Sequence, residues 1–151
     1  MFQIEAHIAA PPDAVFAALA RVSDAPLWYS AVESVEPLDK LSPGRGSQYR
    51  FQRRIGGSVV HNVVEITEFE PEQALTITSL SGPTPFTYRY TLRPSEAGTQ
   101  LHLAGEIAGD GLGGAMSLFK PVAETFFKRG MAANLNTLKQ LIEGARPSAW
   151  R

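Results

Sequence analysis

The chain has 151 residues, which suits a single domain spanning 1–151 with one hydrophobic core. Apolar residues make up 44% of the sequence and charged residues 19%, a balance typical of globular proteins rather than disordered ones. The net charge of −1 does not favour a nucleic-acid groove. The lack of cysteine excludes disulfides, thiolate metal sites and a cysteine nucleophile.

The first ten residues do not resemble a secretory signal. They carry Glu5 and have no charged region ahead of an apolar run. Nowhere does the sequence approach the roughly 18 consecutive apolar residues that a membrane span needs. We therefore expect a cytoplasmic protein without a membrane-spanning segment.

The chain begins with a pattern for one strand and two short helices. Apolar and polar residues alternate over 2–9, which predicts a half-buried strand. Pro11 and Pro12 end this strand and suit the first turn of an amphipathic helix over 12–21. Ser23-Asp24 and the early Pro26 then predict a second short helix.

Residues 32–108 have the pattern of consecutive strands joined by short turns. Gly56-Gly57 stands between two alternating runs, which is a hairpin signal, and Gly82-Pro83 marks another turn. Short connections imply antiparallel pairing, because parallel neighbours need long crossovers. We expect about six strands here.

The last third of the chain predicts one long amphipathic helix over 116–143, with a frayed tail at 145–151. Pro121 either kinks this helix or marks its true start. The preceding GDGLGG at 109–114 matches G-x-G-x-x-G, but no second parallel strand can follow it in the residues that remain. We predict a mobile hinge that binds no phosphate.

Several stretches, in this order, resemble the START-like (SRPBCC) helix-grip superfamily and its polyketide cyclase/dehydrase-like branch. They are APPDAVFAAL, the short helix with Trp28, VESVEPL, ITEFEPEQALTITS, YTLRPSEAGTQL and LNTLKQLIEG. The resemblance implies an α+β helix-grip fold, with about six to seven antiparallel strands curved around a long C-terminal helix and two short helices after the first strand. It also implies a cavity between sheet and helix.

The leading functional hypothesis is binding of a hydrophobic or aromatic, lipid- or polyketide-like small molecule in that cavity, without a cofactor. The expected lining residues are Trp28, Tyr49, Phe51, Val63, Ile77, Tyr88, Tyr90, Leu103, Phe119, Val122, Phe126 and Gly130. Gly130 in mid-helix costs about 1 kcal/mol relative to alanine. Room for a ligand would explain it, and so would a close approach to the sheet.

Arg53 stands out because it shares a strand face with two aromatic residues. A buried guanidinium needs a partner, which Glu65 or a ligand oxygen could supply. Alternatively, Arg53 lies at the strand end in water. His61 has the parity of Val59 and Val63 and could face the cavity.

The alternative function is cyclisation or dehydration of a carbonyl substrate, with Arg53, Tyr49, Tyr88 and His61 as candidate catalytic residues. No acid–base pair can be recognised from their spacing. The histidines lie on separate predicted strands without metal-ligand spacing, and His7 and His102 are expected to face solvent.

A third class is a cochaperone-like module, which would have a filled core and a large exposed apolar patch. The sequence leaves open the ligand, the pathway and the oligomeric state, including a homodimer.

Overall fold

The computed structural model describes residues 1–39, 42–55, 57–107 and 120–144, and the side chains of 55 and 120–123 lie outside that description. The predicted hinge, the predicted frayed tail, Phe119 and the side chain of Val122 therefore fall outside the described part. In chain order the elements are β1 (Phe2–Ile8), α1 (Pro12–Ala20), η1 (a 3-10 helix, Val22–Leu27), β2 (Val32–Pro37), β3 (Gln48–Ile55), β4 (Ser58–Glu70), β5 (Ala74–Ser81), β6 (Phe86–Ser95), β7 (Gly98–Ile107) and α3 (Lys120–Gly144).

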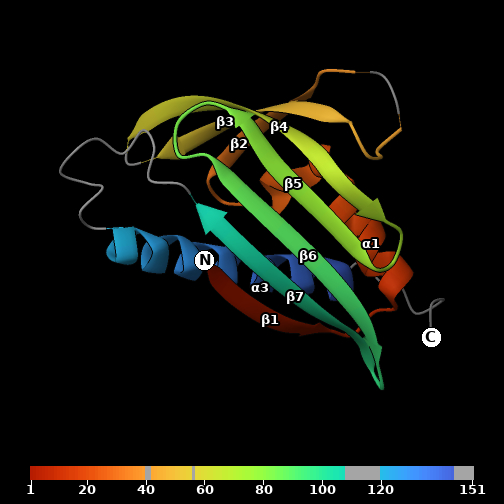
Figure 1. Ribbon diagram of the computed structural model, residues 1–151. Helices are drawn as coiled ribbons and strands as arrows, with labels where there is room; N and C mark the ends of the chain where they lie inside the picture. The colour runs from red at the N-terminus through yellow and green to blue at the C-terminus, as the bar shows by residue number, and fades with distance from the viewer. Residues whose placement is uncertain (40–41, 56, 108–119, 145–151) are drawn as a thin grey trace.

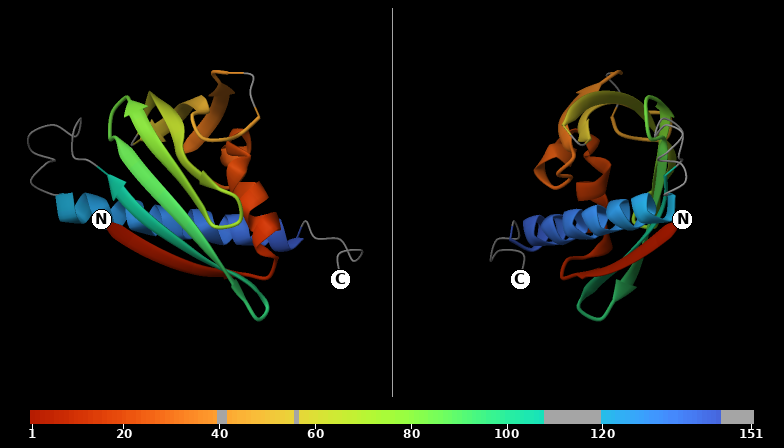
Figure 2. Two further views of the ribbon diagram at one scale, coloured as in Figure 1. Left: turned by 45° about the vertical axis from the view of Figure 1, so that its right-hand side comes forward. Right: turned by 90° about the vertical axis from the view of Figure 1, so that its left-hand side faces the viewer.

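The strands form one antiparallel sheet of seven strands in the order β1-β7-β6-β5-β4-β3-β2. From β2 to β7 each strand pairs with the next along the chain, and β1 closes the order by pairing with β7. Figures 1 and 2 show the sheet curving over α3, with α1 and η1 on the same side. The α+β architecture expected from the sequence is confirmed.

The three helices that the structure describes correspond to the three predicted ones. Pro12 begins α1, where a missing backbone N–H costs nothing, and the Asp13 carboxylate accepts a hydrogen bond from Ala14 N at 2.9 Å. The second short helix is of the 3-10 type and contains Pro26. The described part of α3 runs from Lys120 to Gly144, and residues 116–119 of its predicted range lie outside the described residues.

The core lies between the inner face of the sheet and α3. Alternation along β6 buries Phe86, Tyr88 and Tyr90. From α3, Leu135 and Leu138 are buried in the same hydrophobic core, and burying a leucine fully is worth about 2 kcal/mol. In the described residues, no helix is both long and apolar enough to cross a membrane.

Candidate functional site

A pocket of about 320 Å³ opens between the first half of α3 and the sheet. It is lined by Tyr29, Ser30, Ala31, Arg53, Arg54, Tyr88, Phe126, Phe127, Gly130, Met131 and Asn134. Two hydrogen bonds hold its walls together: Ser30 N donates to Asn134 Oδ1 at 3.1 Å, and Arg54 N donates to Ala31 O at 2.9 Å. Its volume is at the lower end of the range of small-molecule sites.

Arg53 is the buried cation of this pocket, with 2% of its surface exposed. Its Nε donates to Asn62 Oδ1 at 2.9 Å, and its Nη2 donates to Pro83 O at 3.0 Å and to Thr84 Oγ1 at 2.7 Å. The guanidinium carbon lies 4.9 Å from the centre of the Phe86 ring, a distance that permits a cation–π contact. The side chain is therefore fixed on one side by polar bonds and on the other by an aromatic face.

These bonds anchor Arg53 to the turn between β5 and β6. Gly82 in this turn has φ +101°, and a β-carbon there would overlap His61 O and the Asn62 amide. Thr84 also has a positive φ, 47°, which is a strained conformation for a β-branched residue. Its hydroxyl donates to Pro83 O at 2.8 Å while accepting from Arg53. The turn and the guanidinium thus stabilise each other.

Two phenols stand beside Arg53. The Tyr29 hydroxyl donates to Tyr88 Oη at 3.3 Å, and the two rings are 6.3 Å apart. Burial raises the pKa of Tyr29, against hydrogen bonding to Tyr88 and the positive charge of Arg53. Burial, and then the neighbouring Tyr29, raise the pKa of Tyr88 well above its usual value. Both are neutral at physiological pH, so they act as hydrogen-bond donors and not as bases.

A cavity of about 20 Å³ lies deeper, behind Tyr29 and Tyr88. That is room for about one water molecule. Its other lining residues are Leu19, Val22, Ala25, Trp28, Phe51, Ile77, Phe86 and Tyr90. Trp28 Nε1 is the buried side-chain polar atom without a hydrogen-bond partner among the described residues. A third pocket, of about 410 Å³, lies between α1, η1 and the C-terminal half of α3, and Trp28 lines it as well.

The structure divides the predicted lining residues into groups. Tyr88, Phe126 and Gly130 line the pocket at α3. Trp28, Phe51, Ile77, Tyr88 and Tyr90 line the deeper cavity. Tyr49 and Leu103 are buried in the core but line neither of these two spaces.

The prediction for His61 and Val63 is wrong, because it placed them on the inner face of β4. Alternation along β4 buries Asn62 and Val64, so His61 is exposed and Val63 faces outward. Valine occurs on both faces of this strand, at 59, 60, 63 and 64, so periodicity does not identify the buried face.

Two of the predictions for Arg53, a salt bridge to Glu65 and a position in water at the strand end, are also wrong. Arg53 is not at a strand end in water, and its partner is not Glu65. Gln48 lies opposite Glu65 in the β3–β4 register and donates to its carboxylate at 2.9 Å, whereas Arg53 lies opposite Val60. The inward orientation that Arg53 shares with Tyr49 and Phe51 is confirmed.

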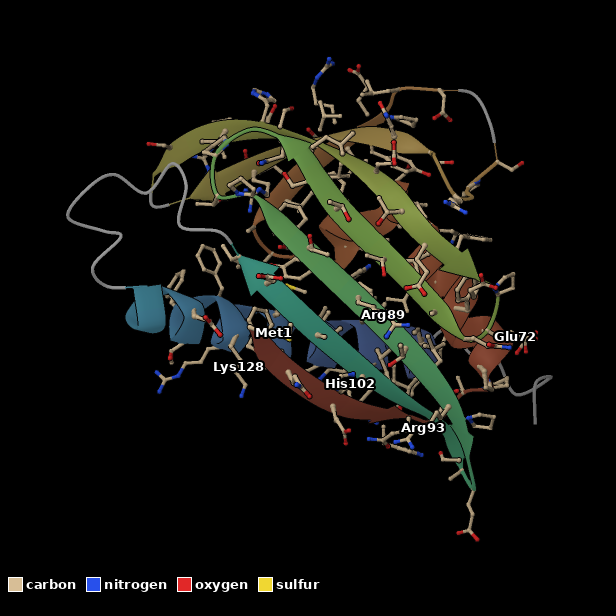
Figure 3. All side chains as sticks on the ribbon, in the orientation of Figure 1. Met1, Glu72, Arg89, Arg93, His102 and Lys128 are labelled. Carbon is tan, nitrogen blue, oxygen red and sulfur yellow. The ribbon has the colours of Figure 1, made fainter. Side chains whose placement is uncertain are left out.

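Among the candidate catalytic residues, the pocket brings together Arg53 and Tyr88 but neither His61 nor Tyr49. The pKa of Tyr49 is raised by burial and by the nearby Asp39. His7 is exposed and bonds to Ser95 Oγ at 2.9 Å, and His102 bonds to Gln3 Oε1 at 3.0 Å. Figure 3 labels His102 on the sheet, where it alternates with buried leucines and so faces away from α3. In the described residues, no three His, Asp or Glu side chains gather as metal ligands.

Sequence reasoning missed Tyr29, Asn62 and Thr84 as site residues. Tyr29 follows Trp28 at the end of η1, and its adjacency to an aromatic residue in a short helix was a usable signal. Asn62 was hidden by the wrong parity on β4, and Thr84 carries no signal beyond the turn residues before it.

The comparisons with known proteins agree with this architecture. The family described as polyketide cyclase/dehydrase and lipid transport matches residues 1–143. The Zhui aromatase/cyclase of Streptomyces sp. R1128 is 20% identical, with a TM-score of 0.80, over 98% of this chain and 96% of that chain. The protein TTHA0849 of Thermus thermophilus is 19% identical, with a TM-score of 0.75, over 96% of this chain and 98% of that chain.

A plant protein has the same fold. The ginseng major latex-like protein 151 of Panax ginseng is 11% identical, with a TM-score of 0.69, over 91% of this chain and 93% of that chain. No protein with a curated description matches the sequence. At these identities the structural matches show the fold, whereas the family match spans nearly the whole sequence. The chain belongs to the polyketide cyclase/dehydrase and lipid transport family.

Proposed function

We propose that the protein binds an apolar or aromatic small molecule, with an oxygen atom of that molecule held at Arg53. The observation that carries this proposal is the pocket itself, in which aromatic and apolar side chains surround one buried guanidinium and two neutral phenols. The aromatic walls suit a hydrophobic body, and the few polar groups suit its orientation. Family membership supports the same class of ligand.

Gly130 offers a direct test. It lines the pocket, and a β-carbon built on it meets no atom within 4 Å. A methyl group is therefore accommodated, and we expect the longer side chain of leucine to reach into the ligand space. The probe is the neutral fluorophore N-phenyl-1-naphthylamine. We expect binding to the wild type, little change in Gly130→Ala, and affinity lower by on the order of tenfold in Gly130→Leu.

Ala132→Leu is the matched control, because it adds a leucine to an exposed position of the same helix outside the pocket lining. It should bind the probe as the wild type does. No binding to the wild type, or equal binding to Gly130→Leu, would contradict the proposal.

A second candidate function is catalysis of an aldol-type cyclisation. It is favoured by the convergence of Arg53 and Tyr88 on one pocket, since both donate hydrogen bonds that can stabilise a developing enolate oxygen. None of the described lining residues is a histidine or a carboxylate that could serve as the base. Binding is therefore the leading proposal.

The test of catalysis is the rate at which an aryl-capped linear 1,3,5-triketone cyclises, followed by the absorbance of the aromatic product. A catalyst accelerates the reaction above the buffer rate, and Arg53→Met removes most of the acceleration. Equal rates with wild type and Arg53→Met would remove Arg53 from the mechanism.

A protein-binding module has less support, because it would need a large patch of exposed apolar side chains. In the described residues the large exposed apolar side chains are Met1, Leu27, Leu38, Val59, Leu80, Phe126 and Leu141. Leu27 and Leu141 line one pocket of about 410 Å³, and the others lie on other segments or on another part of α3.

A further inference from the structure

Arg53 differs from the ion-paired arginines of this protein. Arg21, Arg50, Arg54 and Arg89 each form an ion pair, and their side chains are 46–60% exposed. Arg53 is 2% exposed, and none of the ion pairs in the described part of the chain includes it. Among the described residues, carboxylates thus pair with the exposed arginines, whose charge water already screens. The buried Arg53, for which an isolated charge is costly, has no such partner there.

The acceptors around Arg53 are all neutral. They are the amide oxygen of Asn62, the carbonyl oxygens of Pro83 and Thr84, the Thr84 hydroxyl and the Tyr29 phenol. These bonds satisfy donors of the guanidinium, and no carboxylate in the described part of the chain pairs with it. Arg53 also lines the pocket.

Asn62 explains why the protein does not supply the counter-charge at this position. Its Oδ1 accepts from Arg53, while its Nδ2 donates to Ser81 O at 3.1 Å and to Pro83 O at 2.9 Å. Aspartate would fit the same volume, but its second oxygen would face two carbonyl oxygens, and an ionised carboxylate has no proton to donate to them. The fold of the turn therefore requires a neutral residue beside the guanidinium.

We propose that the ligand of this pocket is an anion, an apolar or aromatic body carrying a carboxylate or an equivalent oxyanion that neutralises Arg53. This inference rests on the proposed function and specifies the charge of its ligand. Because the Tyr29 hydroxyl donates to Tyr88 Oη, the Tyr88 hydroxyl remains as a hydrogen-bond donor that lines the same pocket. Asn62 is then a specificity-determining residue, because it holds the guanidinium without cancelling its charge.

The experiment compares 2-naphthoate, which is ionised at neutral pH, with 2-naphthamide, which has nearly the same shape and no charge. Calorimetric titration of the wild type should give naphthoate an affinity higher by on the order of ten- to a hundredfold. Arg53→Gln should abolish the difference, mainly by weakening naphthoate. Arg53→Lys, which keeps the charge but loses the fork of donors, should retain part of it.

Arg50→Gln is the control for net charge, because it removes the same charge from an exposed position of the same strand outside the pocket. It should keep the naphthoate preference. Equal affinity of the two ligands for the wild type overturns the inference, as does a preference that persists in folded Arg53→Gln. If Arg53→Gln does not fold, the comparison of naphthoate and naphthamide affinities for the wild type still tests the inference.

The results separate this inference from the function on which it rests. If naphthamide and N-phenyl-1-naphthylamine bind but naphthoate binds no better, the pocket binds hydrophobic molecules and the anion inference is wrong. If none of the three binds, the proposed function itself is wrong.

Discussion

At Gly105, the absence of a β-carbon makes room for an aromatic ring that packs beside the site. Gly105 lies in β7 opposite Phe2 of β1, and a β-carbon at 105 would overlap the Phe2 ring. That ring is buried and lies 6.2 Å from the ring of Tyr88. Glycine at 105 therefore leaves the space in which Phe2 supports one of the two phenols of the pocket.

We predict that Gly105→Ala lowers the free energy of unfolding by about 1–3 kcal/mol, because the buried Phe2 ring has to move. Urea denaturation measures the change. Gly130→Ala is the matched control: its methyl group enters open space on a helix, so it should raise stability by up to about 1 kcal/mol. Similar destabilisation by both variants would show that the cost is not the overlap with Phe2.

The tyrosines predict an unusual alkaline titration. The chain has four, and the pKa of each is raised, in every case mainly by burial. In the unfolded chain they release protons near their usual pKa of about 10. The folded protein binds more protons above that pH, so this contribution to stability is complete below pH 10 and is lost as the pH rises above it.

Phenolate absorbance measures this directly. We expect little absorbance change in the folded protein at pH 10, followed by a steep rise that coincides with loss of the far-ultraviolet circular dichroism. Tyr88→Phe should leave that pattern intact with a smaller amplitude. A smooth titration centred at pH 10, with circular dichroism unchanged, would show that the phenols are accessible.

At the scale of the elements, polar side chains near the C-terminus of α3 bind the backbone at the end of β1. Ala9 N donates to Glu143 Oε2 at 2.8 Å, and Lys139 Nζ pairs with the same carboxylate while donating to His7 O at 2.8 Å. The Ala9 hydrogen bond, followed by Lys139, lowers the pKa of Glu143. The last helix thus holds the end of β1 by one bond from Lys139 and one to the ionised carboxylate of Glu143, which are themselves ion-paired.

We predict that Glu143→Gln lowers stability at neutral pH by less than about 1 kcal/mol, since the cluster is partly exposed. Because the folded pKa is lowered, this contribution is present above the usual pKa of the carboxyl and is lost as the pH falls through the folded value. Thermal unfolding should therefore separate the variant from the wild type at neutral pH, and the two should converge in acid. A constant difference down to acid pH would assign the effect to packing.

The elements also show what the sequence could predict. Turn residues and period-two alternation predict the strands and their antiparallel order, because each connection is short. The inner face of β4 could not be predicted, because apolar residues lie on both faces and the decisive inward residue is the polar Asn62. Asn62 faces inward because it bonds to Arg53 and to Pro83 O in the β5–β6 turn, and only the folded sheet brings these groups together.

For the molecule as a whole, the pocket depends on contacts between distant segments. Strand parity identifies Arg53 and Tyr88, and the cost of glycine in a helix identifies Gly130, but the phenol pair joins residues 29 and 88, and the pocket wall joins 30 and 134. Such pairs leave no local pattern in a single sequence. The sequence therefore predicts some of the residues that line the pocket, but not which of them contact one another.

The same long-range connections predict that the chain unfolds as one unit. Helix α3 packs against β1, β1 pairs with β7, and the remaining strands follow in an unbroken sheet, so the last element cannot separate without exposing the core of the first. Trp28 and Trp150 are the two tryptophans, so Trp150→Phe leaves Trp28 as the only indole, in the core beside Tyr29.

In that variant, urea unfolding followed by Trp28 fluorescence and by helical circular dichroism should give one midpoint and one slope. A saturating ligand of the pocket should move both curves together to higher urea, because it stabilises the folded state alone. If the helical signal falls at lower urea than the fluorescence, α3 detaches before the sheet opens. A ligand shift confined to the helical curve would then place the binding energy in the docking of α3 rather than in the folding of the whole domain.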